Sequence, residues 1–457
     1  MLKKLLTAAG LVLGMSLQAA ADPTVVGYYA TWKKDQTAGV DLAKYTHVNI
    51  AFGEPTANGS VHFVDPVSLP DVVSEIHGSG AKALLSLGGW AGSYAFSDVV
   101  KSPAATTNLI THILDLITKN ELDGIDLDWE YPGRAGDTCN SIDEAHDTPN
   151  YLEFLQKLRT QLDSTFGIGK KLLTMAVRTQ PFDVDGAPLT DISAFAKLVD
   201  FANLMIYDIN GAWQAQTGPN APFDYEEGKA EQVSFITAID AWTAAGWPAA
   251  KLNAGLAFYG RSTTTLVDMT LDPHNQYQNQ SNVVPQGDET DLPAFDACAN
   301  ATAVSGTWMY KKLREQGILT TPTTAASPWV RQWDSTTKTP WLFNPTTKQY
   351  ITYDDPESIK IKVDYAASRG LGGVMVWALY MDYKNELLHA LQTWGTAPAA
   401  GKACQAEGQL ACNDLSGMSP DYLVCLYGKW LALSCNPNTA CLPNQDSIVC
   451  GWPKHKK

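Results

Sequence analysis

After residue 21 the sequence has no run of about 18 apolar residues, the length that a membrane-spanning helix requires. Basic residues are also scarce, because 33 Lys and Arg stand against 48 Asp and Glu, for a formal net charge of -15. A surface this acidic repels the phosphates of nucleic acids and of anionic lipids. We therefore expect no nucleic-acid partner and no membrane partner, and any polymer substrate should be neutral or cationic.

The signature motifs of several enzyme classes are missing. There is no H-E-x-x-H and no histidine pair at ligand spacing, which disfavours a zinc site. Ser86 stands in Leu-Leu-Ser-Leu-Gly, which lacks the first glycine of the G-x-S-x-G elbow. Gly78-Ser79-Gly80 has no third glycine at position 83, as a dinucleotide-binding loop requires. We predict no metal and no cofactor.

Cysteine is rare in the first 403 residues, which hold only Cys139 and Cys298. The six others are Cys404, Cys412, Cys425, Cys435, Cys441 and Cys450. A segment this small cannot build a large core, and such segments are typically cross-linked by disulfides in an oxidising compartment. Six cysteines allow fifteen connectivities, which the sequence does not distinguish. Cys139 and Cys298 are candidates for a further disulfide, with two free buried thiols as the alternative.

The N-terminus has the pattern of a secretory signal. Lys3 and Lys4 precede an apolar run over 5–17, and Ala19 to Ala21 offers a small-residue cleavage site. The run is too short to cross a hydrocarbon layer of about 30 Å. We predict a signal peptide over 1–21 and a secreted, extracellular product. Sequons for glycosylation occur at Asn58, Asn279 and Asn300.

Eight short runs rich in Val, Ile, Leu and Tyr recur along residues 22–395, and amphipathic helical patterns separate most of them. The expected strands are 25–30, 47–52, 83–87, 124–130, 172–177, 201–207, 252–259 and 373–379. The clearest helices are 106–119, 151–166 and 231–245. Eight strand–helix repeats predict an α/β fold, a (β/α)8 barrel, rather than an open doubly wound sheet.

The spacing of the strands breaks once, between the seventh and the eighth. A structureless loop over 262–353 is implausible inside a compact domain. We predict an α+β insertion there, on the top face of the barrel, where it forms one wall of a cleft. A linker over 396–402 then leads to a disulfide-rich module over 403–457.

The fourth expected strand carries acidic residues on one face. Side chains alternate along a strand, so Asp126, Asp128 and Glu130 share a face and apolar residues share the other. Three acids inside a core are costly unless function requires them. Glu130 comes last, at the end of the strand where barrel enzymes perform catalysis. Like charges this close do not all ionise, so the three carboxyl groups share a proton. This proton keeps Glu130 able to act as an acid near neutral pH. The structural alternative is a solvated face of an exposed edge strand.

Stacked carboxylates serve either to bind magnesium or calcium or to catalyse glycosyl transfer. Aromatic residues at the other strand ends favour carbohydrate chemistry, because sugar rings stack on aromatic faces. These residues are Tyr28, Phe52, Trp90, Tyr131, Tyr207, Trp213 and Trp377. A metal-dependent hydrolase remains the less favoured alternative.

The segment Asp123-Gly-Ile-Asp-Leu-Asp-Trp-Glu130 resembles the D-x-x-D-x-D-x-E signature of glycoside hydrolase family 18, the chitinases. Ser86-Leu-Gly-Gly-Trp90 resembles the S-x-G-G motif of that family, and Met205-Ile-Tyr-Asp208 resembles its sixth-strand motif. Tyr259-Gly-Arg261 and Trp377 are similar to its last two strand ends. The resemblance covers residues from about 25 to 391. It implies a chitinase that cleaves β-1,4 bonds between N-acetylglucosamine units with retention of configuration, and we expect a monomer.

The resemblance also implies roles for individual residues. Glu130 would protonate the leaving glycosidic oxygen. The substrate's own N-acetyl group, rather than a second carboxylate, would attack the anomeric carbon to give an oxazolinium. Asp128 would orient the acetamide, and Asp126 would share a proton with Asp128. Tyr207 would hydrogen-bond the acetamide oxygen.

Other matched residues would hold the sugar chain. Asp208 would hold the distorted sugar, Trp377 would form the floor of its subsite, and Arg261 would contact hydroxyls. The expected substrate-binding residues are Tyr28, Phe52, Ser86, Gly89, Trp90, Tyr131, Met205, Asp208, Arg261 and Trp377. Asp123 lies off the acidic face, so we expect it to be structural and buried beneath the strand.

The cysteine-rich segment resembles the family 19 carbohydrate-binding module of fungi, on its cysteine spacing and the stretch Cys425-x-x-Gly428-x-Trp430. The resemblance implies binding of chitin and chito-oligosaccharides, with Tyr427 and Trp430 as contacts. The alternative is an inert disulfide knot.

Two other functions remain open at this stage. An endo-β-N-acetylglucosaminidase acting on N-glycans has the same strand motif, and a non-catalytic chitin lectin has the same fold. The sequence does not distinguish cleavage inside a chain from cleavage at its ends.

Overall fold

The structure is a computed structural model that describes residues 22–63, 68–296, 298–394, 400, 402–404, 406–412, 419–444 and 447–452. The expected signal peptide over 1–21 lies outside the described residues, as does most of the expected linker over 396–402.

Eight parallel strands form a closed barrel. They are β1 (Thr24–Ala30), β2 (His47–Pro55), β4 (Lys82–Gly88), β5 (Gly124–Asp128), β6 (Leu172–Val177), β9 (Phe201–Leu204), β10 (Leu252–Ala257) and β20 (Gly373–Trp377). Each pairs with the next around the ring, and β1 pairs with both β2 and β20, which closes it. The short β3 (Val61–His62) is added antiparallel to β2. The predicted (β/α)8 barrel is therefore confirmed.

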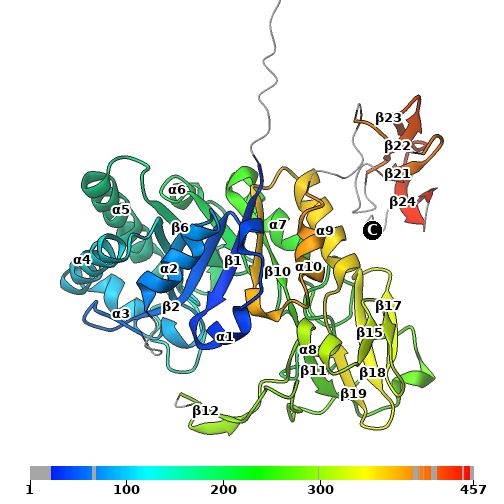
Figure 1. Ribbon diagram of the computed structural model, residues 1–457, viewed down its shortest axis with the longest axis horizontal. Coiled ribbons are helices and arrows are strands. Elements are labelled where there is room, and N and C mark those ends of the chain that lie inside the picture. The colour runs from blue at the N-terminus through cyan, green and yellow to red at the C-terminus, as the bar shows by residue number, and fades with distance from the viewer. Residues whose placement is uncertain are drawn as a thin grey trace, which may run out of the picture.

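Helices surround this barrel, as Figure 1 shows. They are α1 (Lys34–Thr37), α2 (Leu69–Gly78), α3 (Phe96–Lys101), α4 (Pro103–Asn120), α5 (Asp147–Phe166), α6 (Ser193–Ala196), α7 (Phe235–Ala244), α9 (Pro356–Ser368) and α10 (Glu386–Leu391). In α4, the Ser102 side chain accepts the backbone N–H of Ala105 and Pro103 opens the first turn, which are typical start signals of a helix. Leu109, Ile113 and Ile117 then form one buried face of α4.

An α+β insertion follows β10. Its antiparallel sheet has the order β14 (Thr307–Met309), β11 (Tyr259–Thr264), β19 (Gln349–Thr352), β18 (Thr339–Asn344) and β17 (Val330–Asp334). It also contains α8 (Tyr310–Glu315) and the hairpins β12 (Ala294–Asp296) with β13 (Ala301–Ala303) and β15 (Leu319–Thr321) with β16 (Thr324–Ala325). Another small hairpin, β7 (Asp183–Val184) with β8 (Ala187–Pro188), lies after β6.

The predicted seventh strand, 252–259, is wrong at its end. The barrel strand β10 stops at Ala257, and Tyr259 already begins the sheet of the insertion. The reason lies in the backbone of Phe258, whose N–H donates to Trp377 of β20 while its carbonyl accepts from Tyr310 of the insertion. Arg261 is therefore a residue of the insertion and not of a barrel strand.

The C-terminal module consists of two small sheets. One contains β21 (Leu410–Cys412), β22 (Asp421–Leu426) and β23 (Lys429–Ser434), and the other contains β24 (Ala440–Asn444) and β25 (Ser447–Gly451). Three disulfides join Cys404 to Cys425, Cys412 to Cys441 and Cys435 to Cys450. The structure thus selects one connectivity among those that the sequence allowed.

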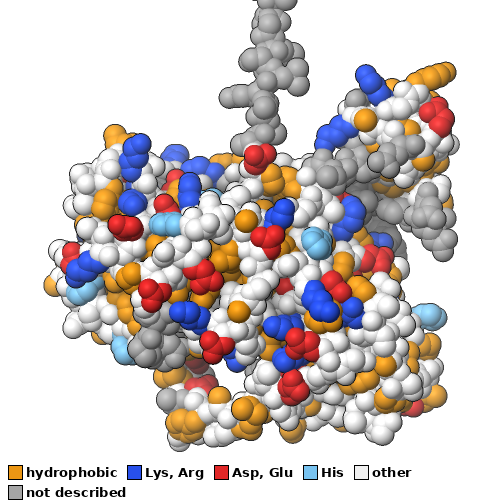
Figure 2. All heavy atoms as spheres, in the orientation of Figure 1, with side chains coloured by type: hydrophobic (Ala, Val, Ile, Leu, Met, Phe, Trp, Pro, Cys, Tyr) orange, Lys and Arg blue, Asp and Glu red, His pale blue; other side chains and the backbone are white. Residues whose placement is uncertain are grey.

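A fourth disulfide joins Cys139, in the loop after β5, to Cys298, between β12 and β13. The alternative of two free thiols is therefore wrong. Figure 2 shows acidic and basic side chains interspersed over the visible face. Among the described residues, no helix has both the length and the hydropathy to cross a membrane.

Candidate active site

The acidic residues of β5 point into the barrel and are buried. The exposed fractions are 0% for Asp126, 3% for Asp128 and 9% for Glu130. Glu130 lies two residues beyond the last residue of β5, at the carboxyl end of the barrel. The predicted alternation thus brings all three carboxyl groups to one site, and the alternative of a solvated edge strand is wrong.

Asp126, the deepest carboxylate, is held by hydroxyl groups from the two neighbouring strands, β4 and β6, and from β1 across the barrel. Its Oδ2 accepts hydrogen bonds from Tyr28 at 2.7 Å and from Ser86 at 2.8 Å. Its Oδ1 accepts one from Thr174 at 2.6 Å. Sequence reasoning missed Thr174, although a single hydroxyl in the apolar run Leu-Leu-Thr-Met-Ala-Val was a usable signal. Register explains the contacts, because Ser86 and Thr174 both stand opposite Asp126 in the sheet.

Burial raises the pKa of all three carboxyl groups. The pKa of Asp126 is raised by loss of water and is partly lowered again by its hydroxyl donors. Burial and then the charges of Glu130 and Asp126 hold the pKa of Asp128 well above its usual range. Burial, with a smaller contribution from the charge of Asp208, raises the pKa of Glu130 to about 7. Glu130 is therefore a group that can carry a proton at neutral pH.

Asp128 has an unused hydrogen-bonding atom. Its Oδ1 is buried and has no partner among the described residues. A buried acceptor without a partner costs free energy in the folded chain. The arrangement therefore favours an external N–H donor at this atom, two residues before Glu130 and on the same face of the strand.

The backbone around Glu130 is fixed by side chains that sequence reasoning missed. The Glu130 N–H donates to Ser93 Oγ at 2.9 Å, and Asn140 Nδ2 donates to the Glu130 carbonyl at 2.8 Å. The neighbouring Gly88 has a φ of 109°, and a Cβ there would lie 2.2 Å from the carbonyl oxygen of Asp128. Only glycine fits this approach.

Tyr207 and Asp208 face the acids from the end of β9. The Tyr207 hydroxyl lies 3.7 Å from the sulfur of Met375, and burial and nearby carboxylates hold its pKa well above its usual range. Asp208 Oδ1 accepts hydrogen bonds from Tyr259 at 2.7 Å and from Arg261 at 2.6 Å. The insertion thus supplies both partners of Asp208.

Aromatic rings line the site beside these polar groups. Phe52 and Trp377 stack with ring centres 5.8 Å apart, and Tyr28 lies 5.5 Å from Trp377. Trp32, which sequence reasoning missed, stacks on Phe52 and is 43% exposed. Two further expected residues, Trp90 and Trp213, are 53% and 58% exposed to solvent.

A cavity of about 300 Å³ opens between the barrel and the insertion. Trp377 lines it from the barrel, and Tyr259 and Arg261 line it from the insertion, together with Asp208. The remaining lining comes from the polar residues Lys33, Asp288, Thr290, Asp291, Ser305 and Thr307, and from Met309, Tyr380 and Met381. Aromatic faces beside hydroxyl and carboxylate groups fit a carbohydrate ligand.

The remaining expected site residues lie near the cleft. Gly89 is packed so that a Cβ would lie 2.6 Å from the Phe52 ring. Met205 is half-buried in the core that also holds Tyr207. Burial and the charge of Glu130 hold the pKa of Tyr131 well above its usual range.

Two expectations were wrong in their placement. Asp123 lies at the opposite end of β5 and is structural, but its side chain is 33% exposed rather than buried. It accepts the Ala83 N–H at 2.8 Å and contacts His77 Nε2 at 2.9 Å. Trp430 is only 5% exposed, because it forms the core of the C-terminal module with Leu423. Tyr427 is 93% exposed, as a surface contact requires. The three sequon asparagines are exposed.

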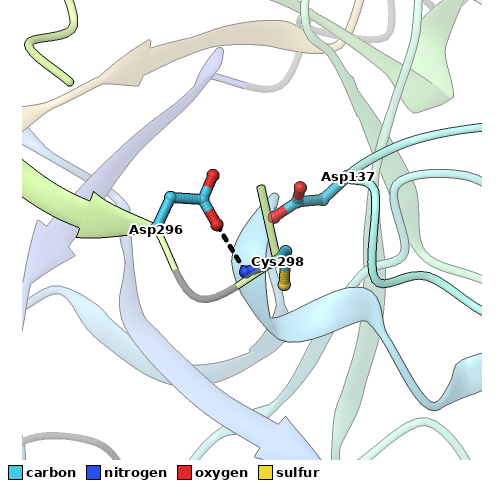
Figure 3. A group of neighbouring side chains, drawn as sticks. All are labelled: Asp137, Asp296 and Cys298. Carbon is cyan, nitrogen blue, oxygen red and sulfur yellow. Dashed lines mark hydrogen bonds between the residues drawn. The ribbon is translucent and has the colours of Figure 1, made fainter. Parts of the chain in front are cut away.

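Among the described residues, one group of side chains has the composition of a metal site, namely Asp137, Asp296 and Cys298 (Figure 3). The sulfur of Cys298 is bonded to Cys139, so it offers no thiolate. Asp296 Oδ1 accepts the N–H of Cys298 at 2.7 Å, as the dashed line shows. The group therefore forms part of a disulfide-bonded turn.

Comparison with known proteins adds the family. Residues 24–382 match the model of glycosyl hydrolases family 18, and residues 387–446 match that of the carbohydrate binding domain of family 19. A chitinase-like effector of Moniliophthora roreri is 33% identical over 83% of this chain and 95% of its own length. Chitinase A1 of Niallia circulans is 30% identical over 83% of this chain and 60% of its own length. The crystal structure of a chitinase from Rhizomucor miehei superposes with a TM-score of 0.73, at 37% identity over 81% of this chain and 99% of that one.

Proposed function

We propose that this chain, which belongs to glycoside hydrolase family 18, is a secreted chitinase that hydrolyses β-1,4 bonds between N-acetylglucosamine units of chitin. One observation carries the proposal: a buried carboxyl group with a pKa of about 7, Glu130, lies beside the unpartnered oxygen of Asp128. These two groups supply a proton and an acceptor for an amide N–H in one site.

The first step transfers the proton of Glu130 to the glycosidic oxygen as the bond from that oxygen to the anomeric carbon breaks. The carbonyl oxygen of the substrate's acetamide attacks the anomeric carbon and gives an oxazolinium ion. Asp128 Oδ1 accepts the acetamide N–H and stabilises the positive charge that develops there. The Tyr207 hydroxyl donates a hydrogen bond to the acetamide oxygen and so positions the nucleophile.

The second step adds water to the anomeric carbon from the face that the leaving sugar vacated. Glu130, now a carboxylate, takes the proton of this water, and the bond to the acetamide oxygen breaks. Two inversions at one carbon give net retention of configuration. Asp126 supports both steps by placing a carboxyl group, held by three hydroxyl donors, beneath Asp128.

Replacing Glu130 with Gln tests this assignment. Glu130→Gln should lower kcat on chitin hexamer by about 10²–10⁴-fold, the usual contribution of a general acid, and leave hexamer binding intact. In the native chain, turnover should fall as the pH rises through about 7, because Glu130 must carry a proton.

The matched control is Asp123→Asn, which alters an acid of the same motif at the far end of β5 and should leave kcat unchanged. Near-normal hydrolysis by Glu130→Gln would refute the proposal. Undiminished activity after chelation is the expected result if no metal takes part.

A second candidate function has support from a relative. The Moniliophthora roreri protein is named a chitinase-like effector, a name that does not state cleavage. A chain that binds chitin fragments without cutting them would bind the hexamer and give no products even with Glu130 in place. An endo-β-N-acetylglucosaminidase would instead cleave a glycoprotein in preference to chitin hexamer.

We also propose secretion of the mature chain from residue 22 onward. Four disulfides support an oxidising compartment. N-terminal sequencing of the protein in the culture medium tests this, and the expected first residue is Asp22. In the C-terminal module, Tyr427 and Trp452 expose aromatic rings that can stack on chitin.

A further inference from the structure

The β12–β13 hairpin leaves the sheet of the insertion as a two-stranded segment, here called the strap and defined as the described residues 291–296 and 298–305. Figure 1 shows it extending below the carboxyl ends of the barrel strands. Both legs are tied together at their root by Asp291. Its Oδ1 accepts the Ser305 N–H at 2.9 Å, and its Oδ2 accepts the N–H groups of Gly287 and Gly306. The root is therefore a fixed point.

The root of the strap belongs to one wall of the active site. Thr307, two residues after the strap, pairs with Arg261, which binds Asp208. Asp291 and Ser305 line the same cavity as Asp208 and Trp377. The strap thus starts beside the residues that face Glu130.

The tip of the strap is bonded to the loop that follows Glu130. Cys298 forms its disulfide with Cys139, in the loop that follows Glu130. The next residue of that loop, Asn140, donates a hydrogen bond to the Glu130 carbonyl. The two legs run from Asp291 to Asp296 and from Ala301 to Ser305, which is five and four residue steps, enough to reach about 13–17 Å when extended, and the turn over 298–300 places Cys298 at the tip. This reach is sufficient to cross a cleft that holds one sugar chain.

The strap has little packing of its own against protein. Leu292 is 68% exposed and Phe295 is 65% exposed, although both are apolar. In Figure 2 hydrophobic side chains gather at the lower edge of the molecule, where Figure 1 places β12. Among the described residues of the strap, the hydrogen bonds to the rest of the chain lie at its root and the disulfide lies at its tip.

We propose that the strap spans the mouth of the active-site cleft and that the Cys139–Cys298 disulfide closes it into a ring, so that a chitin chain reaches Glu130 by threading an end. This inference rests on the proposed function. The walls of the ring are the insertion, the barrel and the loop after β5, and the disulfide closes the ring covalently at the tip. A polymer cannot enter a closed ring sideways, so attack inside a long chain is suppressed.

The charges at the tip oppose closure. The carboxylates of Asp137 and Asp296 lie with oxygen atoms within 4.8 Å of each other and of the Cys298 sulfur (Figure 3). Like charges at this distance repel. The disulfide therefore holds together a contact that electrostatics would separate, and its removal should free the tip.

The test compares the mode of attack with and without the disulfide. The full-length chain and the double variant Cys139→Ser/Cys298→Ser are given a water-soluble chitin derivative of high molecular mass. The fall in viscosity is measured per reducing end released, since interior cuts lower viscosity far more than end cuts. The rate on chitin hexamer, which has free ends, is measured in parallel.

We expect the double variant to lower viscosity several-fold more per reducing end, with the hexamer rate unchanged. The matched control is Cys435→Ser/Cys450→Ser, which removes a disulfide of the C-terminal module and should leave the viscosity ratio at the native value. If the double variant does not fold, a chain with residues 293–303 replaced by Gly-Gly removes the strap tip and serves the same comparison.

Equal viscosity ratios in the native chain and in a strap variant that cleaves hexamer would overturn the inference. A native chain that cleaves neither substrate would instead refute the proposed function. The two failures are therefore distinguishable.

Discussion

The three carboxyl groups of Asp126, Asp128 and Glu130 serve the proposed function, but their burial costs stability when they ionise. Each has a pKa in the folded chain above its ordinary value, because burial favours the protonated form. The unfolded chain therefore binds fewer protons than the folded chain between about pH 4 and the raised pKa values. The contribution of these groups to the free energy of unfolding is therefore highest below their pKa values in the unfolded chain. It is lost as the pH rises from there through their raised pKa values in the folded chain.

This sign gives a prediction for Asp128. Asp128→Asn removes the ionisable group, whose charged form is disfavoured by burial and by the charges of Glu130 and Asp126. We expect Asp128→Asn to raise the free energy of unfolding at pH 7 while abolishing most turnover. Denaturant titration at pH 7 and near pH 4 measures it, and the gain should vanish at the lower pH. No gain at pH 7, or a gain equal to that of Asp123→Asn, would contradict the prediction.

The residue pattern identified the three acidic residues of the site, but not the residues that hydrogen-bond to them. Asp126, Asp128 and Glu130 stand at a spacing of two, which places them on one face of any strand. Thr174 and Asn140 are single polar residues with no such spacing. Their contacts with Asp126 and with the Glu130 backbone arise from strand register and from the path of one loop. No local pattern encodes either of these.

Among the elements, α9 is held by a buried ion pair to the short link that joins it to β19. Lys362 Nζ lies 2.5 Å from Asp354 Oδ1, and both side chains are 1% exposed. Burial lowers the pKa of Lys362, and Asp354 opposes this shift. Removing one member leaves a buried charge without its partner.

We therefore expect Lys362→Met to lower the free energy of unfolding by about 3–5 kcal/mol. Thermal or denaturant unfolding of the full-length chain measures this. The control is Lys157→Met, because Lys157 is half-exposed on α5 and pairs with the exposed Glu153 at the surface. A loss for Lys362→Met no larger than that of the control would show that the buried pair does not hold the element in place.

On the scale of the whole molecule, the C-terminal module exposes aromatic rings. We expect the catalytic domain to cleave short substrates without them. Tyr427 is 93% exposed at the turn between β22 and β23. We expect Tyr427→Ala to weaken adsorption to insoluble chitin by about fivefold, the equivalent of about 1 kcal/mol for one stacked ring. The hexamer rate should not change.

Leu431→Ala is the matched control, since Leu431 is a 44% exposed apolar side chain of the same module without an aromatic ring. Adsorption that falls equally in both variants would indicate a general loss of apolar surface. Unchanged adsorption in Tyr427→Ala would exclude this ring as a chitin contact and leave Trp452 as the exposed aromatic to examine.

The sequence by itself determined the barrel, the acidic face of its fourth strand and the presence of a stapled module. Each follows from a local period or a local density, namely alternation in strands, recurrence of strand and helix, and six cysteines in one short segment. It could not place Arg261 on the insertion, bury Trp430, choose the disulfide partners or bring Cys298 to Cys139. Those facts join residues far apart in the chain, so only the packing of whole elements decides them.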